Sequence, residues 1–590
     1  MKTKHSLLGM VFIQLVCLFY LTNELIVLNG HDYGLALTRL LDNHYSYLLS
    51  GFRILDYTAS FCAGVFTFAN PNSPALSLTQ ASTFLFGPQL GIQITFILAS
   101  ALGGVGVYWT VKQAADSIPA ALISANIFMF SGFLTTRFAV GHLNFYTIAL
   151  APLIAALLLR SNHCLLHKNY LSFVFYASIS ALLTAHAIYG GVSGLALPFI
   201  FSIALIFLLG GGMKNNGFRV SMGWFAYLTL SLALSAPKIE ASLSLFKAIG
   251  NRSMYSLPGF DFVGLLQYLM SALFWIPNTK ATNDNLVLSQ WWQGWHELYI
   301  GLTPIVLISL IAWFVYRRKS FEAFRPSNFG LLGTISIIAI LLLPLIMNFH
   351  NEQLTALLKK IPILGDSSNM LRWSCLYVPA FSILAGYSLK NVKAFTPIGF
   401  ACTVFITITV IGFQQMVITK NLVAKETFDP SKLLAGWATK PSDIPKISNL
   451  GILTKKQPDG SVRAIHAPQY DYVFLDGASN VTCYEPIFGY RLENFPVTSV
   501  SSGSIYQARG GRLNIVNPAC YVYPEENNCK PGDLFKTGQK SELKHLINRQ
   551  PMPAKTSLAR RISEWIALFT LAFIGLSTLV FIRNGRRRRF

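Results

Sequence analysis

Ionisable side chains of three kinds lie at the ends of the long apolar segments of this 590-residue sequence. They combine carboxylates, imidazoles and fixed cations: Asp32, His31, Arg137, His142, His186, Lys238, Glu240, Glu297 and Arg372. Charged groups at membrane depth are costly, so their placement is informative. All of these residues fall at the same ends of the apolar segments. An acid, a base and an imidazole at one depth are what an active site at a membrane–water boundary requires, and we predict that they converge there.

Most members of this set also have a purely structural explanation. The basic side chains Arg137, Lys238 and Arg372 are equally explained by contact with lipid head groups. The imidazoles and the two glutamates are individually explained by interfacial hydrogen bonds and by structural ion pairs. Asp32 is the exception, because it directly follows the first apolar run, in GHDYG, where flanking-charge rules do not favour an acid. The prediction therefore centres on Asp32.

The composition requires a membrane around these residues. Hydrophobic residues make up 53% of the chain, charged residues only 12%, and the mean hydropathy is +0.47. A water-soluble domain cannot bury this much apolar surface. The formal net charge of +22 would fit a nucleic-acid partner, but most of the excess Lys and Arg flanks apolar runs and sets topology instead. We therefore predict a lipid bilayer as partner and no nucleic acid.

The apolar runs predict an all-α polytopic protein. Runs of roughly 17–25 residues are long enough to cross a bilayer. About twelve occur, at 7–29, 86–110, 118–136, 145–160, 170–188, 191–210, 219–237, 299–316, 329–348, 371–389, 396–418 and 562–583. The first run has no convincing cleavage site, so we interpret it as a retained helix. The predicted organisation is a multi-spanning region over 1–418, an outer domain over 419–560, and a last helix with a basic tail over 561–590.

Basic residues in alternate loops predict the orientation. The connections after the second, fourth and sixth runs carry Lys112, Lys168 and Lys214, and the C-terminus ends in RRRRF. The positive-inside rule then places both termini in the cytoplasm. We expect a multi-pass protein of the bacterial inner membrane, with 419–560 in the periplasm or outside the cell.

Three outer segments are long, at 30–85, 238–298 and 419–560. The first two contain amphipathic stretches, LTRLLDNHYSYLLSGF and VGLLQYLMSALFWIP, which favour helices along the membrane surface. The third alternates in YDYVFLDG, VTSVSSGSIYQA and RLNIVNP, which predicts a small β-containing domain. An oxidising compartment would allow a disulfide between Cys520 and Cys529, with Cys483 as the competing partner.

Stretches in the first 390 residues resemble a known enzyme class. DYTASFCAGVFTFANPNSP (56–74) resembles a first-loop motif, and FSGFLTTRFAVGHLNFYTIALAPL (130–153) is similar to an "SGF…R…GH…PL" element. HELYIGLTPIVL (296–307) and MLRWSCLY (370–377) add weaker matches. The class is the GT-C integral membrane glycosyltransferases, and within it the YfhO-type members. The sequence contains no P-loop, dinucleotide-binding, HExxH or CxxC motif that favours a soluble enzyme.

The resemblance implies transfer of a sugar from a polyprenyl-phosphate donor to a glycan, lipid or protein acceptor outside the cytoplasm. The donor phosphate needs fixed positive charge, which Arg137, Lys238 or Arg372 would supply. The acceptor hydroxyl needs a general base, and Asp32 is the predicted one, with inversion at the anomeric carbon. The remaining residues of the set are predicted to bind substrate.

One feature departs from the class. Many GT-C enzymes carry two carboxylates in an Asp-x-Asp or Glu-x-Asp pair, but His31 precedes Asp32 here. A divalent metal is therefore not supported by a paired-carboxylate motif, although a helical first loop would let Asp42 or Asp56 approach. The cofactor, the sugar and the acceptor stay open. The competing functions are a membrane transporter of a lipid-linked or polar substrate and a non-enzymatic protein of envelope assembly.

Overall fold

The computed structural model describes residues 16–20, 22–23, 26–29, 32–60, 65–192, 195–212, 217–249, 262–265, 326–349, 353–354, 357, 370–388, 428–451, 454–456, 462–464, 468–480 and 558–587. Within these ranges the protein is mostly helical. Six helical segments are long and apolar enough to cross a membrane: Pro88–Ala115, Ile118–Ala139, Leu143–Leu166, Tyr170–Tyr189, Arg219–Leu245 and Arg560–Val580. Ala196–Leu209 and Leu332–Asn348 are shorter apolar helices.

The helices follow the predicted apolar runs. The elements of the bundle are α3 (Leu78–Phe86), α4 (Pro88–Ala115), α5 (Ile118–Met129), α6 (Gly132–Ala139), η1 (Leu143–Leu150), α7 (Ala151–Leu166), α8 (Tyr170–Tyr189), α9 (Ala196–Leu209), α10 (Gly217–Ile249), α15 (Pro326–Asn348), η4 (Met370–Leu376), α17 (Tyr377–Ser388) and α21 (Leu558–Arg587). Eight predicted runs therefore correspond to spans or shorter apolar helices, and 371–389 begins as the 3₁₀ helix η4. The runs at 7–29, 299–316 and 396–418 lie wholly or mostly outside the described residues, so the predicted count of about twelve stays a prediction.

Close packing around α4 organises the bundle. Three glycines of α4 face its neighbours, and a Cβ on any of them would overlap another chain segment. A Cβ on Gly103 would lie 2.4 Å from Ala149 O, one on Gly104 2.5 Å from Met129 Cγ, and one on Gly106 2.2 Å from Leu153 N. Small residues let helix backbones approach closely in a membrane, where no hydrophobic force drives helix association. These contacts hold α5, η1 and α7 against α4.

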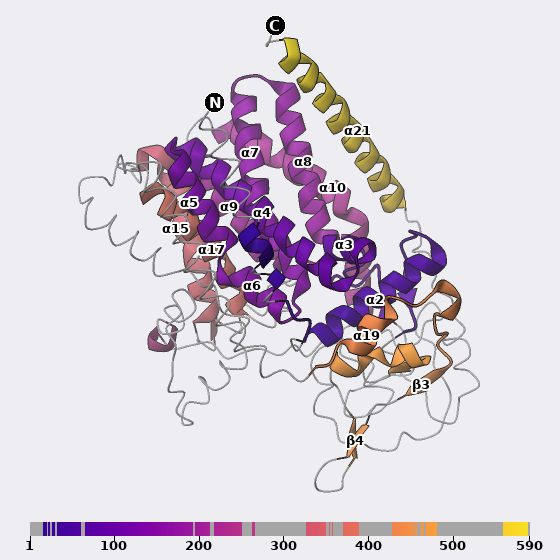
Figure 1. The fold of residues 1–590 in the computed structure, drawn as a ribbon. Helices are drawn as coiled ribbons and strands as arrows, with labels where there is room; N and C mark the ends of the chain where they lie inside the picture. The colour runs from indigo at the N-terminus through magenta and orange to yellow at the C-terminus, as the bar shows by residue number, and fades with distance from the viewer. Residues whose placement is uncertain are drawn as a thin grey trace.

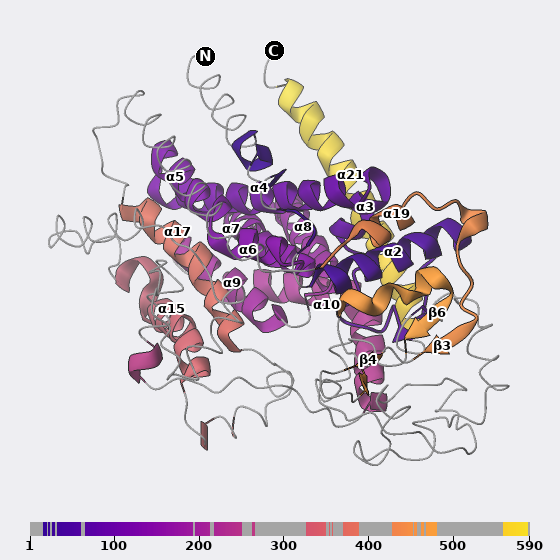
Figure 2. The ribbon, with the colours of Figure 1, turned by 60° about the horizontal axis from the view of Figure 1, so that its bottom comes forward.

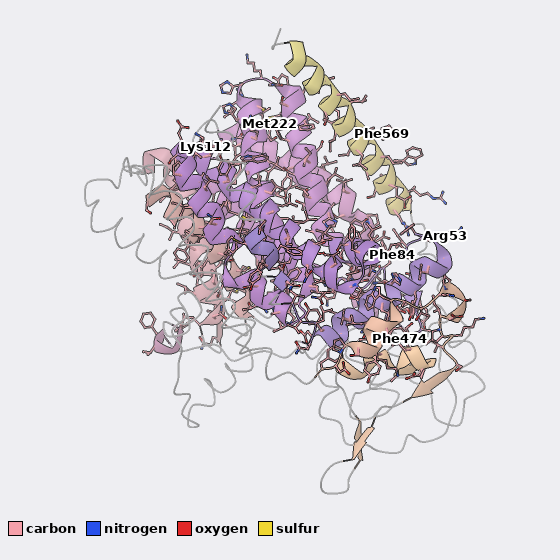
Figure 3. The ribbon with its side chains drawn as sticks, viewed as in Figure 1. Arg53, Phe84, Lys112, Met222, Phe474 and Phe569 are labelled. Carbon is pink, nitrogen blue, oxygen red and sulfur yellow. The ribbon has the colours of Figure 1, made fainter. Side chains whose placement is uncertain are left out.

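The elements of the predicted outer segments, called the outer elements below, gather at one end of the bundle. They are α2 (Tyr33–Ser50), α19 (Ser431–Gly436), η5 (Pro441–Asp443), η6 (Pro468–Asp476) and the short strands β1 (Tyr57–Thr58), β2 (Val65–Phe66), β3 (Asn449–Gly451), β4 (Thr454–Lys456), β5 (Val462–Ala464) and β6 (Ala478–Asn480). Figure 1 shows α2, α19 and β3 at this end, while the α7–α8 connection and the C-terminal end of α21 lie at the other. In Figure 3, Lys112 and Phe474 mark these opposite ends. Figure 2 shows α15 and α17 across the bundle from the outer elements.

The described part of the outer segment packs on α2. Tyr45 on α2 donates a hydrogen bond from its hydroxyl to Gly436 O at 3.0 Å, and its ring meets that of Phe474 edge-on at 6.1 Å. The strands here form two small pairs, β3–β6 parallel and β4–β5 antiparallel. The prediction of a strand at YDYVFLDG was wrong, because those residues form the 3₁₀ helix η6. The consecutive side chains Phe474 and Leu475 both pack toward α2 and α19, which an alternating strand would not allow.

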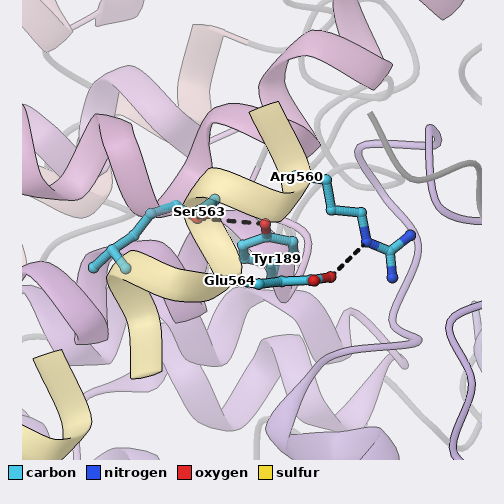
Figure 4. A network of polar contacts seen from close by, with 5 residues as sticks. Tyr189, Arg560, Ser563 and Glu564 are labelled. Atoms are coloured by element: carbon cyan, nitrogen blue, oxygen red, sulfur yellow. Dashed lines mark hydrogen bonds and ion pairs between the residues drawn. The ribbon is translucent and has the colours of Figure 1, made fainter. Parts of the chain in front are cut away.

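The last helix is fixed to the bundle by polar contacts near its outer end. Ser563 of α21 donates a hydrogen bond to Leu234 O of α10 at 2.8 Å, and Tyr189 of α8 donates to the same carbonyl at 3.4 Å. Arg560 and Glu564 form an ion pair beside them at 2.9 Å (Figure 4). The opposite face of α21 is apolar and exposed, with Phe569 pointing away from the bundle (Figure 3). Such a face fits contact with lipid.

Candidate active site

The N-terminus of α2 is held against the end of α6 by main-chain contacts. Asp32 is the N-cap residue of α2. Its backbone N–H donates to Val140 O at 3.0 Å. The next residue, Tyr33, is fully buried and donates from its hydroxyl to Phe138 O at 2.5 Å. Two bonds from successive residues therefore fix the position of the Asp32 main chain relative to residues 138–140.

Gly141 allows this approach. Its φ is +91°, a conformation that residues with a Cβ rarely adopt. A Cβ at this position would lie 2.5 Å from Tyr33 N and 2.7 Å from Asp32 C. A side chain at position 141 would therefore push Asp32 away from His142, the residue that follows Gly141.

His142 joins Asp32 to Arg137. His142 Nε2 contacts Asp32 Oδ2, with the Asp32 side chain 17% exposed and that of His142 10% exposed. The other ring nitrogen, Nδ1, lies 3.0 Å from Arg137 Nη1. Arg137 is completely buried in the last turn of α6, and its carbonyl accepts the His142 backbone N–H at 2.8 Å. The five-residue spacing of Arg137 and His142 thus places a buried cation, an imidazole and a carboxylate in one row.

A phenylalanine brings the second arginine to this row. The ring of Phe145 on η1 stacks on the His142 ring with centroids 5.3 Å apart and planes at 21°. The Arg137 Cζ atom lies 4.5 Å from the Phe145 centroid, and the Arg372 Cζ atom of η4 lies 5.6 Å from it. Cations favour the faces of aromatic rings. Three residues of the predicted set, Arg137, His142 and Arg372, therefore contact the Phe145 ring, and Asp32 joins them through His142. We call these five residues the Asp32 cluster.

Lys238 contacts main chain of the first outer segment. Its side chain lies on α10 and the residue is only 3% exposed. Its ammonium donates to Phe68 O at 2.7 Å and to Asn70 O at 2.8 Å. The Phe68 ring also lies 5.5 Å from Lys238 Nζ and 5.3 Å from the Cζ atom of Arg560. In this structure Lys238 thus secures residues 68–70 against α10 and α21.

The same segment is tied to η1, which also carries Phe145. Asn144 donates from its side chain to Asn72 O at 2.9 Å. The Tyr146 hydroxyl accepts the Leu78 N–H at 3.1 Å and lies 2.9 Å from His186 Nε2. His186 therefore lies beneath the first outer segment, bonded through Tyr146, and the ANPNSP stretch of the predicted motif rests on η1.

Other predicted residues are placed elsewhere. Glu240 is exposed on α10. His31, Glu297, Cys483, Cys520 and Cys529 lie outside the described residues, so their predicted roles stay predictions. Phe145 and Gly141 were not predicted as parts of the site. The GH…F spacing after Arg137 was the available signal, since a glycine before the histidine and an aromatic three residues after it are what this geometry uses.

Asp42 does not pair with Asp32 in the structure. It lies ten residues along α2, a rise of about 15 Å. It is 4% exposed, and its Oδ1 accepts from Ser60 Oγ and, at 3.1 Å, from Thr58 Oγ1. Burial raises the pKa of Asp42, an effect that these hydrogen bonds oppose. Among the described residues, no three His, Cys, Asp or Glu side chains come close enough together to hold a metal ion.

The described helices are those of a multi-pass helical membrane protein. No family model and no curated protein matches the sequence. Among solved structures, the chain is similar to ArnT from Cupriavidus metallidurans, in a crystal structure bound to undecaprenyl phosphate. The match has 13% sequence identity and a TM-score of 0.32, and it covers 70% of this chain and 77% of that one.

Proposed function

We propose that this protein is a membrane glycosyltransferase that moves a sugar from a polyprenyl-phosphate donor to an acceptor outside the cytoplasm, with Asp32 as general base. One observation carries the proposal. A carboxylate that is partly open to solvent lies one imidazole away from the buried guanidinium of Arg137, and Arg372 faces the same phenylalanine ring. The cluster therefore combines a base with fixed positive charge for a leaving phosphate.

The reaction assigns a role to each charge. The acceptor hydroxyl gives its proton to Asp32 as its oxygen attacks the anomeric carbon. The bond from that carbon to the phosphate oxygen breaks in the same step, and polyprenyl phosphate leaves with the electron pair. A single displacement of this kind inverts the anomeric centre. The guanidinium groups of Arg137 and Arg372 stabilise the negative charge that develops on the phosphate.

The membrane setting supports a lipid-linked donor. The cluster lies where α6, η1 and η4 meet the start of α2, at the end of the bundle that carries the outer elements (Figure 1). A polyprenyl chain stays within the bilayer, so its phosphate reaches protein at the level of helix ends. The outer segment that packs on α2 is then placed to bind the acceptor. The sequence resemblance to GT-C enzymes, carried by residues 56–74 and 130–153, points to the same reaction.

Transfer in proteoliposomes tests the proposal. The purified protein is supplied with radiolabelled polyprenyl-phosphate sugars and a mixture of glycan and lipid acceptors. We expect labelled product, and Arg372→Ala should raise the KM for the donor by about tenfold or more, because a charge-assisted hydrogen bond contributes about 1.5–3 kcal/mol. Arg219→Ala is the control and should leave the KM unchanged, because Arg219 lies in the first turn of α10, where it donates to Leu166 O at 3.3 Å and is remote from the Asp32 cluster. Movement of the donor across the bilayer without chemical transfer would contradict the proposal and favour a transporter.

A further inference from the structure

The contacts of His142 determine which of its nitrogens carries the proton. Arg137 Nη1 lies 3.0 Å from His142 Nδ1, and a guanidinium nitrogen can only donate. Nδ1 therefore accepts with its lone pair, which leaves the proton of the neutral ring on Nε2. Nε2 faces Asp32 Oδ2, which accepts when the carboxylate is ionised. The row therefore runs in one direction, from the Arg137 donor through the ring to the Asp32 acceptor.

We infer that His142 is a positioning residue for Asp32 and not the base itself, an inference that rests on the proposed function. Its Nδ1 lone pair is engaged by Arg137, and its Nε2 already carries a proton. Neither nitrogen can take a proton from an acceptor hydroxyl without breaking this row. The sequence-based prediction of His142 as a substrate-binding residue is replaced by this role.

Residues of several elements hold the His142 ring in place. Phe145 of η1 stacks on one face of it, and the His142 backbone N–H is bonded to Arg137 O of α6 at 2.8 Å. In the part of the chain that the structure describes, the charged groups around the ring include Asp32 from α2, Arg137 from α6 and, across the Phe145 ring, Arg372 from η4. A ring fixed in this way fixes the χ angles of Asp32. Loss of the ring removes this contact from the carboxylate, and a displacement of the carboxylate by about 1 Å can cost roughly 100-fold in rate.

Kinetics of two variants at position 142 separate positioning from other roles. His142→Ala should lower kcat by roughly 100-fold and leave the KM for the donor unchanged. His142→Gln should restore most of the rate, because its amide carbonyl can accept from Arg137 while its N–H₂ donates to Asp32. His163→Ala, an exposed histidine at the other end of α7, is the matched control and should have no effect. Equal losses in the Ala and Gln variants, or a raised KM with an unchanged kcat, would overturn the inference.

A spectroscopic readout tests the same point without relying on activity. The protein is labelled with ¹⁵N in its histidine rings, and the signal of His142 is the one missing from His142→Gln. We expect an unprotonated Nδ1 and a protonated Nε2. A protonated Nδ1 would contradict the inference whatever the kinetics show. If the expected tautomer is found but the wild-type protein transfers no sugar, the proposed function fails while the hydrogen-bonded row stands.

Discussion

At the scale of single residues, the Asp32 cluster depends on two stretches of main chain that approach at Gly141. The loop that follows α6 must turn there with a positive φ and pass within contact of the Asp32–Tyr33 peptide. The side-chain contacts between Asp32, His142 and Arg137 exist because of this approach. The same glycine is therefore expected to influence both stability and activity.

Gly141→Ala should destabilise the protein by about 1–3 kcal/mol, because it combines a strained φ with a Cβ that overlaps Asp32 and Tyr33. Thermal unfolding in detergent measures the change, and transfer activity should fall with it. Gly575→Ala on α21 is the matched control: a Cβ there meets nothing within 4 Å. That variant should be neutral or more stable, since alanine favours a helix. Equal stability of the two variants would show that the approach at Gly141 is not needed.

The sequence predicted the composition of the cluster better than its geometry. Asp32, Arg137, His142 and Arg372 were among nine residues predicted to converge, because ionisable groups are costly in a membrane and these lie at the same helix ends. Phe145 was missed because its only signal was its position three residues after His142, and aromatic residues are common in apolar runs. The contact of Lys238 with main-chain carbonyls was missed for a related reason. A pattern of residue types reveals a buried cation but does not show which acceptors the fold will bring to it.

At the scale of elements, α10 links the first outer segment to the last helix. Pro237 lies inside α10 and cannot donate a backbone hydrogen bond. Three residues before it, Leu234 O accepts from Ser563 of α21 and Tyr189 of α8, and one residue after it Lys238 binds the carbonyls of residues 68 and 70. The region around the proline thus holds α21 and the first outer segment in place together.

Ser563→Ala should lower the free energy of unfolding by about 1 kcal/mol, since it removes the hydrogen bond to Leu234 O in a membrane setting. Unfolding in detergent with increasing denaturant measures this. Thr578→Val serves as control on the same helix, because its hydroxyl is exposed and bonds only within α21, to Ile574 O. A loss as large in the control as in Ser563→Ala would argue against a specific attachment of α21.

The sequence predicted the membrane-spanning helices better than it predicted the elements of the outer segment. The long apolar helices follow directly from run length, because every span must satisfy its own backbone hydrogen bonds. The outer segment gave weaker signals. YDYVFLDG alternates as a strand does, yet it forms η6, because packing of Phe474 and Leu475 against α2 and α19 decides its conformation. The alternation of apolar and polar residues in a short stretch does not reveal such tertiary contacts.

At the scale of the whole molecule, the bundle has two chemically different ends. The end with the α7–α8 connection carries exposed Lys168 and the basic end of α21, whereas α2, α19 and the Asp32 cluster lie at the other (Figure 1). The positive-inside rule predicts that the first end faces the cytoplasm. The proposed chemistry then takes place on the outer face.

Cysteine labelling in sealed vesicles of known orientation tests this arrangement. Lys168→Cys in the α7–α8 connection and Lys432→Cys on α19 are both at exposed positions. A membrane-impermeant thiol reagent should label the first from the cytoplasmic side and the second from the outer side. The wild-type protein, with its own cysteines, sets the background. Labelling of both positions from one side would contradict the two-ended arrangement.

Sugar transfer by Asp32→Asn tests directly whether Asp32 is the general base. Asparagine keeps the size of the side chain and can still accept from His142, but it cannot take a proton from an acceptor hydroxyl. Wild-type protein in proteoliposomes should transfer radiolabelled sugar from a polyprenyl-phosphate donor, and Asp32→Asn should be slower by roughly 100-fold or more, with normal thermal stability. Equal transfer by both proteins would remove Asp32 from the mechanism and contradict its role as the general base.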